Sequence, residues 1–313
     1  MPLIISNKKI LPPDFYQAII DLEVLSEAKA FLFICDGSIT NELVAKIRSL
    51  RKELLPAKRI IAIVDSGGGS IDAAHRLLQF LRENGRALDI YVPEYAKSAA
   101  TFLCLGADNI IMHENAELGP LDPQFKDPKG RRFISVLDRA KSIDYLRNHA
   151  IETFDIMTQL ILKRTEFILK DAIEVAQNFT KNICEPLYSK VDPDKLGEYM
   201  RLIGIGEEYT RRAMIRYGYS SIGAKEVDRI VNKIIYGYPS HGFVIDYQEA
   251  LDLKLNVRLP SADEKDKLDK ISDFMGKISC VGTLPVIAKQ AKKESEKPNG
   301  KETLGKEPVL QKR

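Results

Sequence analysis

The chain has 313 residues, which is enough for one or two domains with a substantial core. Its composition is ordinary for a globular protein, and its net charge of +3 is too small to indicate nucleic acid binding. No stretch approaches the ~20 consecutive apolar residues that span a bilayer, and the beginning of the chain lacks the pattern of a secretion signal. The sequence therefore favours a cytoplasmic protein, and a membrane role, if there is one, is expected to be peripheral.

Strand-like and helix-like runs alternate through the first part of the chain. Apolar strands are predicted at 31–35, 59–64, 88–92 and 109–112, with helices over about 39–54, 71–81 and 98–107. Because nearly all strand residues are apolar, both faces of the sheet are expected to be covered, as in parallel sheets. The pattern predicts an α/β fold with a mostly parallel sheet.

The second half of the chain is expected to be rich in helices. Residues 134–176 are mainly helical in pattern, and breaks are expected at Asp192–Pro193 and at Gly204 and Gly206. A short strand and one helix are predicted within 242–257. The expected organisation is an α/β core (1–133), a helix-rich part with a closing strand–helix unit (134–260), a C-terminal extension (261–287) and a disordered charged tail (288–313).

Three glycines, Gly67, Gly68 and Gly69, follow the strand at 59–64. Their spacing does not match a dinucleotide-binding GxGxxG, and no lysine follows as in a phosphate-binding loop. A tight turn would need only one glycine. The pattern therefore favours a backbone N–H group that faces a developing negative charge, and such a donor needs a nucleophile nearby.

Ser98 is the candidate nucleophile. It follows the third predicted strand and opens an apolar helix, where unpaired N–H groups, including that of Ala99, favour an anion. Taken alone, Ser98 is more simply a helix N-cap. Because ligands of parallel sheets collect at the carboxyl ends of strands, the glycines and Ser98 are expected to meet there.

Three segments together resemble a known family: DSGGGS (65–70), YAKSAAT (95–101) and GADNIIMHENAELGPLDPQ (106–124). They are most similar to the serine dehydrogenase proteinase family, which is grouped with Clp proteases, signal peptide peptidases and crotonases. The resemblance covers roughly 39–125 and recurs weakly at FVIDYQEALDLKLNV (243–257). It implies a Clp/crotonase-type β-α-β superhelical core and a serine peptidase that needs no ATP, metal or other cofactor. It also implies peptide or protein substrates and a homo-oligomer.

Carried over by motif, the resemblance makes Ser98 the nucleophile and the N–H groups of Ala99 and of Gly68 or Gly69 the oxyanion donors. The same group of enzymes binds substrate peptides as added β-strands beside this loop, which also requires a bare backbone.

The general base is the open question. Clp proteases use a histidine whose matching position falls near Leu121 or Asp122, where this chain has none. Signal peptide peptidases use a lysine on a later helix, which favours Lys141, since it borders an apolar face that would promote the neutral amine. His241, oriented by Asp122, is the alternative base.

Two other functions stay open at this point. A crotonase-like acyl-CoA enzyme would hold a thioester enolate in the same oxyanion hole and would not need Ser98. A non-catalytic member of the fold would bind peptides or act as a scaffold without turnover.

Overall fold

A computed structural model describes residues 4–5, 13–25, 30–35, 38–49, 57–126, 133–273 and 280–283. Its centre is a seven-stranded sheet. The strand order is β1 (Ile4–Ile5), β11 (Cys280–Thr283), β2 (Ala30–Cys35), β3 (Ala57–Asp65), β4 (Gly85–Val92), β6 (Asn109–Met112) and β10 (Val257–Arg258). The strands from β2 to β10 pair in parallel, whereas β11 is antiparallel to both of its neighbours. The predicted mostly parallel sheet is confirmed.

Helices cover both faces of this sheet. Residues of β3 alternate between the faces, so Ile60, Ala62 and Val64 join the main core while Ile61 and Ile63 are buried on the other side. The main core contains residues of α2 (Asn41–Ser49), α4 (Ile71–Asn84) and α5 (Ala99–Leu105). On the other side lie α1 (Pro13–Leu25) and α11 (Ala262–Ser272), which pack against each other. The apolar character of the strands follows from this double cover.

A buried carboxylate attaches α11 to the sheet. Glu264 Oε1 accepts a hydrogen bond from the Tyr91 hydroxyl (2.8 Å), and Arg258 donates to both of its oxygens (2.7 and 2.8 Å). The N–H of Ser261 donates to Oε2 (2.8 Å) and completes a capping box. Burial alone would raise the pKa of Glu264, but the bonds from Arg258, Ser261 and Tyr91 outweigh it and hold the pKa at about 2.

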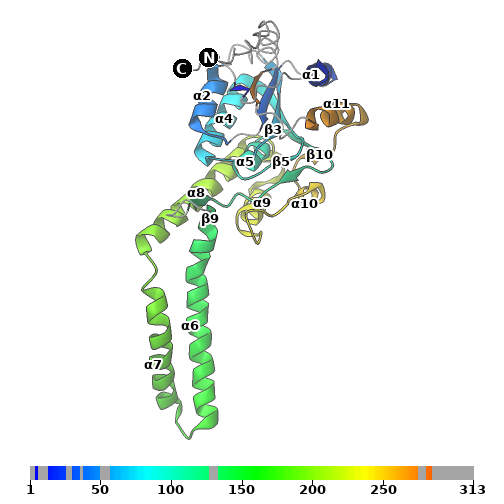
Figure 1. The fold of residues 1–313 in the computed structure, drawn as a ribbon. Coiled ribbons are helices and arrows are strands. Elements are labelled where there is room, and N and C mark those ends of the chain that lie inside the picture. The colour runs from blue at the N-terminus through cyan, green and yellow to red at the C-terminus, as the bar shows by residue number, and fades with distance from the viewer. Residues whose placement is uncertain are drawn as a thin grey trace, which may run out of the picture.

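A long helical hairpin extends from the body of the protein (Figure 1). Its helices are α6 (Val136–Arg164), about 43 Å long at 1.5 Å per residue, and α7 (Leu169–Tyr188). The buried residues of α7, Ala172, Ala176 and Cys184, are small and spaced by multiples of four. This spacing lets α7 pack closely along α6. The helical pattern expected over 134–176 is thus confirmed from 136 onward, with a turn that divides it, whereas residues 134 and 135 lie in a short strand.

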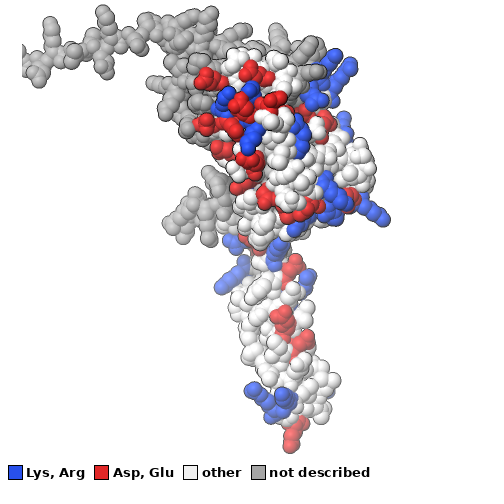
Figure 2. All heavy atoms as spheres, turned by 90° about the vertical axis from the view of Figure 1, so that its right-hand side faces the viewer, with Lys and Arg blue, Asp and Glu red and all other residues white. Residues whose placement is uncertain are grey.

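The hairpin leaves many large apolar side chains exposed. Val175, Phe179 and Ile183 lie at helical spacing along α7, and each is at least 38% exposed. Figure 2 views the hairpin from the side of α6, where uncharged surface is interrupted by acidic side chains along its length and by basic side chains near its far end. Because the hairpin projects from the body, the rest of the protein does not cover the outer faces of its two helices.

The next helix, α8 (Pro193–Arg216), corrects one expectation. Asp192 caps it with its carboxylate and Pro193 opens it, as the sequence indicates, but Gly204 and Gly206 do not interrupt it. Each glycine costs an exposed helix about 1 kcal/mol relative to alanine. Buried Ile203 and Met214 anchor α8 to the core, and this tertiary packing outweighs the local cost.

The remaining elements close the core. They are β5 (Tyr95–Ala96) paired with β7 (Glu117–Leu118), β8 (Gln124–Lys126) paired with β9 (Phe133–Ser135), the 3₁₀ helix η1 (Ser220–Ile222), α9 (Ala224–Tyr236) and α10 (Tyr247–Asp252). The predicted closing unit is present, although its first strand is reduced to one bridge between Ile245 and Leu118. β10 then completes the edge of the sheet.

The predicted domain boundaries stay a prediction. Part of the proposed extension, β11, belongs to the main sheet, whereas the predicted tail (288–313) lies outside the described residues. Among the described helices, none combines the length and apolar character needed to cross a membrane.

We predict that Glu264→Gln destabilises the protein at pH 7 by up to about 3 kcal/mol, since a pKa held at about 2 stabilises the ionised carboxylate. The stabilisation is fully present above pH 4.5, the ordinary value, and is lost as the pH falls toward 2. The difference between variant and wild type should therefore shrink over that interval in urea unfolding. The control is Glu114→Gln. Glu114 is an exposed ion-pair partner of Lys265, which lies on the same helix as Glu264, so this substitution should change the stability little. Equal stability of Glu264→Gln and wild type at pH 7 would contradict this account.

Candidate active site

Ser98 lies where the chain leaves β5 and enters α5. Its φ of 51° is positive, which is rare for a residue other than glycine. The backbone before it is tied to the end of β3: the N–H of Ser66 donates to Tyr95 O (3.0 Å), and the N–H of Lys97 donates to Ser66 O (2.9 Å). These bonds hold Ser98 beside the glycines in a conformation that a free chain would avoid.

Two of the three glycines are required by close contacts. Gly68 has a φ of 104°, and a Cβ there would lie 2.8 Å from Ser98 Cβ. Gly69 has a φ of 145°, and a Cβ there would lie 2.5 Å from Ile39 O. Gly67 is different, because nothing lies within 4 Å of a Cβ at this position. The bare backbone thus makes room for Ser98 on one side and for the Ile39 segment on the other.

Four backbone N–H groups at this site have no acceptor among the described residues, those of Gly67, Gly69, Ser98 and Ala99. Ala99 begins α5, so its N–H has no partner within the helix. The N–H of Gly68 faces Ser66 Oγ at 3.2 Å. Gly69 and Ala99 therefore have donors available for an anion, and Gly68 would have to exchange its partner.

Ser98 opens into a cavity of about 760 Å³, which we call the Ser98 cavity. Gly68, Gly69, Ala99 and His241 also line it. Part of its apolar lining comes from α8, which contributes Leu202, Ile205 and Gly206. The cavity thus combines a polar end around Ser98 with an apolar wall, as small-molecule and peptide sites commonly do.

His241 is joined to a buried carboxylate. Its Nδ1 lies 2.6 Å from Asp122 Oδ1, and Asp122 is only 5% exposed. Asp122 follows Leu121, whose N–H donates to Ile234 O (3.1 Å), so the loop that carries it is attached to α9. With Nδ1 facing the carboxylate, Nε2 is the ring nitrogen left for a second partner.

Lys141 lies apart from Ser98. Its Nζ donates to the carbonyl of Tyr236 (3.3 Å). It lines a separate cavity of about 290 Å³ that includes Asp122 and His241 but not Ser98. Lys97, which directly precedes the serine, extends away from it and pairs with Glu117 (2.6 Å).

All four histidines of the chain lie in its described part, and of these His241 alone lines the Ser98 cavity. His75 stacks on Tyr209 with ring centres 4.1 Å apart, and burial lowers its pKa below the ordinary value. His113 pairs with Asp269 of α11 (2.7 Å), and His149 stacks on Tyr145 of the hairpin.

Two contributors to the site, Thr101 and α8, were not singled out by the sequence patterns. The buried Thr101 hydroxyl lies 2.7 Å from Ala96 O and 2.9 Å from Gly119 O, so it connects α5 to the loop before Asp122. A threonine inside the otherwise apolar AATFLCL was the available signal. The contribution of α8 had none, because it arises from distant packing. Within the described ranges, no group of three or more His, Cys, Asp or Glu side chains is placed to hold a metal ion.

The profile of the ClpP-like SDH-type serine proteinases matches residues 31–205, more than half of the chain, and the chain belongs to this family. The resemblance and the Clp-type fold class are thereby confirmed.

The individual relatives reported for this chain are distant in sequence. Two uncharacterized proteins of Methanocaldococcus jannaschii are each 29% identical, over 161 and 150 residues, or 51% and 45% of this chain. The alignments cover 50% and 49% of those proteins, so the chain spans about half the length of the curated relatives it matches. A mutant of the 1510-N membrane-bound stomatin-specific protease is similar in structure, with a TM-score of 0.44 and 16% identity over 77% of this chain and 83% of the other.

We predict that Gly68→Ala destabilises the protein by at least about 2 kcal/mol, because the new methyl group meets Ser98 and the backbone has a positive φ. Urea unfolding measures this change. Gly67→Ala is the matched control on the same loop and should have little effect, since its Cβ has open space. If the two substitutions cost the same, the close approach of Gly68 to Ser98 is not what the loop requires.

Proposed function

We propose that this protein is a serine peptidase in which Ser98 is the nucleophile, His241 the general base and Asp122 the residue that orients His241. The observation that carries the proposal is that Ser98, the bare glycine backbone and the Asp122-bound His241 meet at one cavity. Lys141, which the sequence favours as the base, is not adopted, because its Nζ binds Tyr236 O and it lies outside this cavity. Membership of the proteinase family supports the reaction class.

In the proposed reaction, Ser98 Oγ attacks the peptide carbonyl while His241 Nε2 takes the hydroxyl proton. The carbonyl oxygen becomes an anion that accepts hydrogen bonds from the N–H groups of Ala99 and of Gly69 or Gly68. The C–N bond then breaks, and His241 returns the proton to the departing amine. A water molecule, activated by His241, hydrolyses the acyl-enzyme and restores Ser98. Asp122 stays ionised and stabilises the positive ring of His241.

The proposed substrate is an extended polypeptide, and no cofactor takes part in the scheme. Bare backbone at the glycines suits a peptide that lies along the loop as an added strand. The apolar wall from Leu202 and Ile205 suits an apolar side chain next to the cleaved bond. The homo-oligomer, the cytoplasmic location and a peripheral membrane role remain predictions from the sequence.

We predict that wild-type protein reacts with a fluorophosphonate probe and that Ser98→Ala does not, because the probe captures an activated serine hydroxyl. Gel fluorescence measures labelling, and hydrolysis of a peptide ester should disappear in the same variant. Equal labelling of the two proteins would refute the peptidase assignment and favour a non-catalytic, peptide-binding protein.

We predict that His241→Ala lowers kcat/KM for peptide hydrolysis by about 10²–10⁴-fold, the usual contribution of a general base. Asp122→Asn should also lower it, because the ring of His241 loses its orienting carboxylate. Lys141→Ala is the matched comparison on the neighbouring cavity and should stay close to wild type. A severe loss in Lys141→Ala with an active His241→Ala would reverse the assignment of the base.

A further inference from the structure

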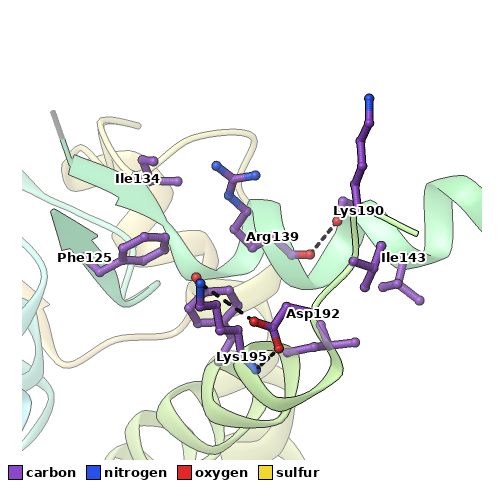
Figure 3. Close-up of a pocket in the computed structure, with 11 residues that line it drawn as sticks. Phe125, Ile134, Arg139, Ile143, Lys190, Asp192 and Lys195 are labelled. Atoms are coloured by element: carbon purple, nitrogen blue, oxygen red, sulfur yellow. Dashed lines mark hydrogen bonds and ion pairs between the residues drawn. The ribbon is translucent and has the colours of Figure 1, made fainter. Parts of the chain in front are cut away.

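A second cavity, of about 280 Å³, lies at the root of the hairpin, and we call it the hairpin-root cavity (Figure 3). It lies where β8, β9, the beginning of α6 and the turn from α7 to α8 come together. Phe125 and Tyr199 form an aromatic wall, with ring centres 5.1 Å apart. Ile134 and Ile143 add apolar surface. The interior thus suits an apolar group.

The charge around this cavity is positive. Arg139, Lys190 and Lys195 line it, against one carboxylate, that of Asp192. Asp192 is already engaged, since it accepts from the N–H groups of Asp194 and Lys195 and lies 3.7 Å from Lys195 Nζ. Figure 3 shows the Lys190 ammonium extending away from the cavity.

Arg139 is the cation of this cavity that remains available to bind a ligand. Within the part of the chain that the structure describes, no carboxylate pairs with its guanidinium. A guanidinium beside an apolar cavity recognises a carboxylate by a two-point hydrogen bond.

The hairpin-root cavity and the Ser98 cavity are lined by the same stripe of α8. Lys195, Tyr199, Leu202 and Gly206 are spaced by four, three and four residues and therefore share a face of the helix. The first two line the hairpin-root cavity, and the last two line the Ser98 cavity. The same division occurs in β8, where Gln124 lines the Ser98 cavity and its neighbour Phe125 the other.

We propose that the hairpin-root cavity is a substrate subsite that binds an acidic residue, with an apolar neighbour, of a peptide that is cleaved at Ser98. The proposal rests on the peptidase function. Corresponding members of the two pairs of lining residues are seven residues apart on α8, which is about 10 Å at 1.5 Å per residue. An extended peptide covers that distance in about three residues. The preferred substrate therefore carries an acidic side chain about three positions from the residue held in the Ser98 cavity.

Peptide binding to the full-length Ser98→Ala protein tests this subsite without turnover. The probes are fluorescein-labelled peptides with a central leucine and either glutamate or glutamine three positions before or after it. One glutamate peptide should bind about fivefold more tightly than its glutamine partner in fluorescence anisotropy, as expected for a partly exposed charge pair. Arg139→Ala should abolish this preference, and added salt should weaken it. Arg147→Ala, an exposed arginine on the same helix and outside the cavity, should preserve it.

Equal affinities for every glutamate and glutamine pair would overturn the subsite, as would a preference that persists in Arg139→Ala. In wild-type enzyme, Arg139→Ala should raise KM for the preferred glutamate peptide and leave kcat, and the KM of the glutamine peptide, unchanged. Failure of the peptidase function has a different signature. The glutamate preference and its dependence on Arg139 would remain, while wild-type protein would cleave no peptide and its labelling would equal that of Ser98→Ala.

Discussion

The backbone of Gly68 approaches Ser98 so closely that a single added carbon would collide with the serine. Both residues adopt a positive φ, which is easy for glycine and costly for serine. The turn around Ser98 is held by bonds between Ser66 and the backbone on either side of Ala96, and the glycine loop by bonds to Ile39. The strained conformation of Ser98 is therefore stabilised by two segments that follow strands of the sheet, one that contains Ser66 and the glycines and one that contains Ile39.

The same rigidity brings together segments that are far apart in the chain. Thr101 links α5 to Gly119, and Leu118 pairs with Ile245 shortly after His241. Asp122 and His241 are held by these two loops, so their contact depends on the core being folded around α5. A catalytic group placed in this way needs little reorganisation when a substrate arrives.

Helices outside the sheet supply the surfaces that we propose for substrate recognition. One face of α8 lines both the Ser98 cavity and the hairpin-root cavity, and Arg139 of α6 lines the second. The proposed chemistry at Ser98 and the proposed selection of an acidic residue would thus depend on separate elements. The hairpin also carries exposed apolar side chains, which suits the oligomer expected from the family resemblance.

Local sequence determined the parallel sheet, the helix that Ser98 opens and the family, because apolar periodicity and short motifs record what each segment buries. The sequence also placed the glycines with Ser98, since both follow the carboxyl ends of strands. It favoured Lys141 over His241 as the base, but of the two only His241 lines the Ser98 cavity, because it lies on a distant loop that folding brings there. It was wrong about Gly204 and Gly206, where burial of Ile203 and Met214 outweighs helix propensity. Only the tertiary structure decided which side chains line the Ser98 cavity and where α8 ends, since contacts between remote segments leave no mark on local periodicity.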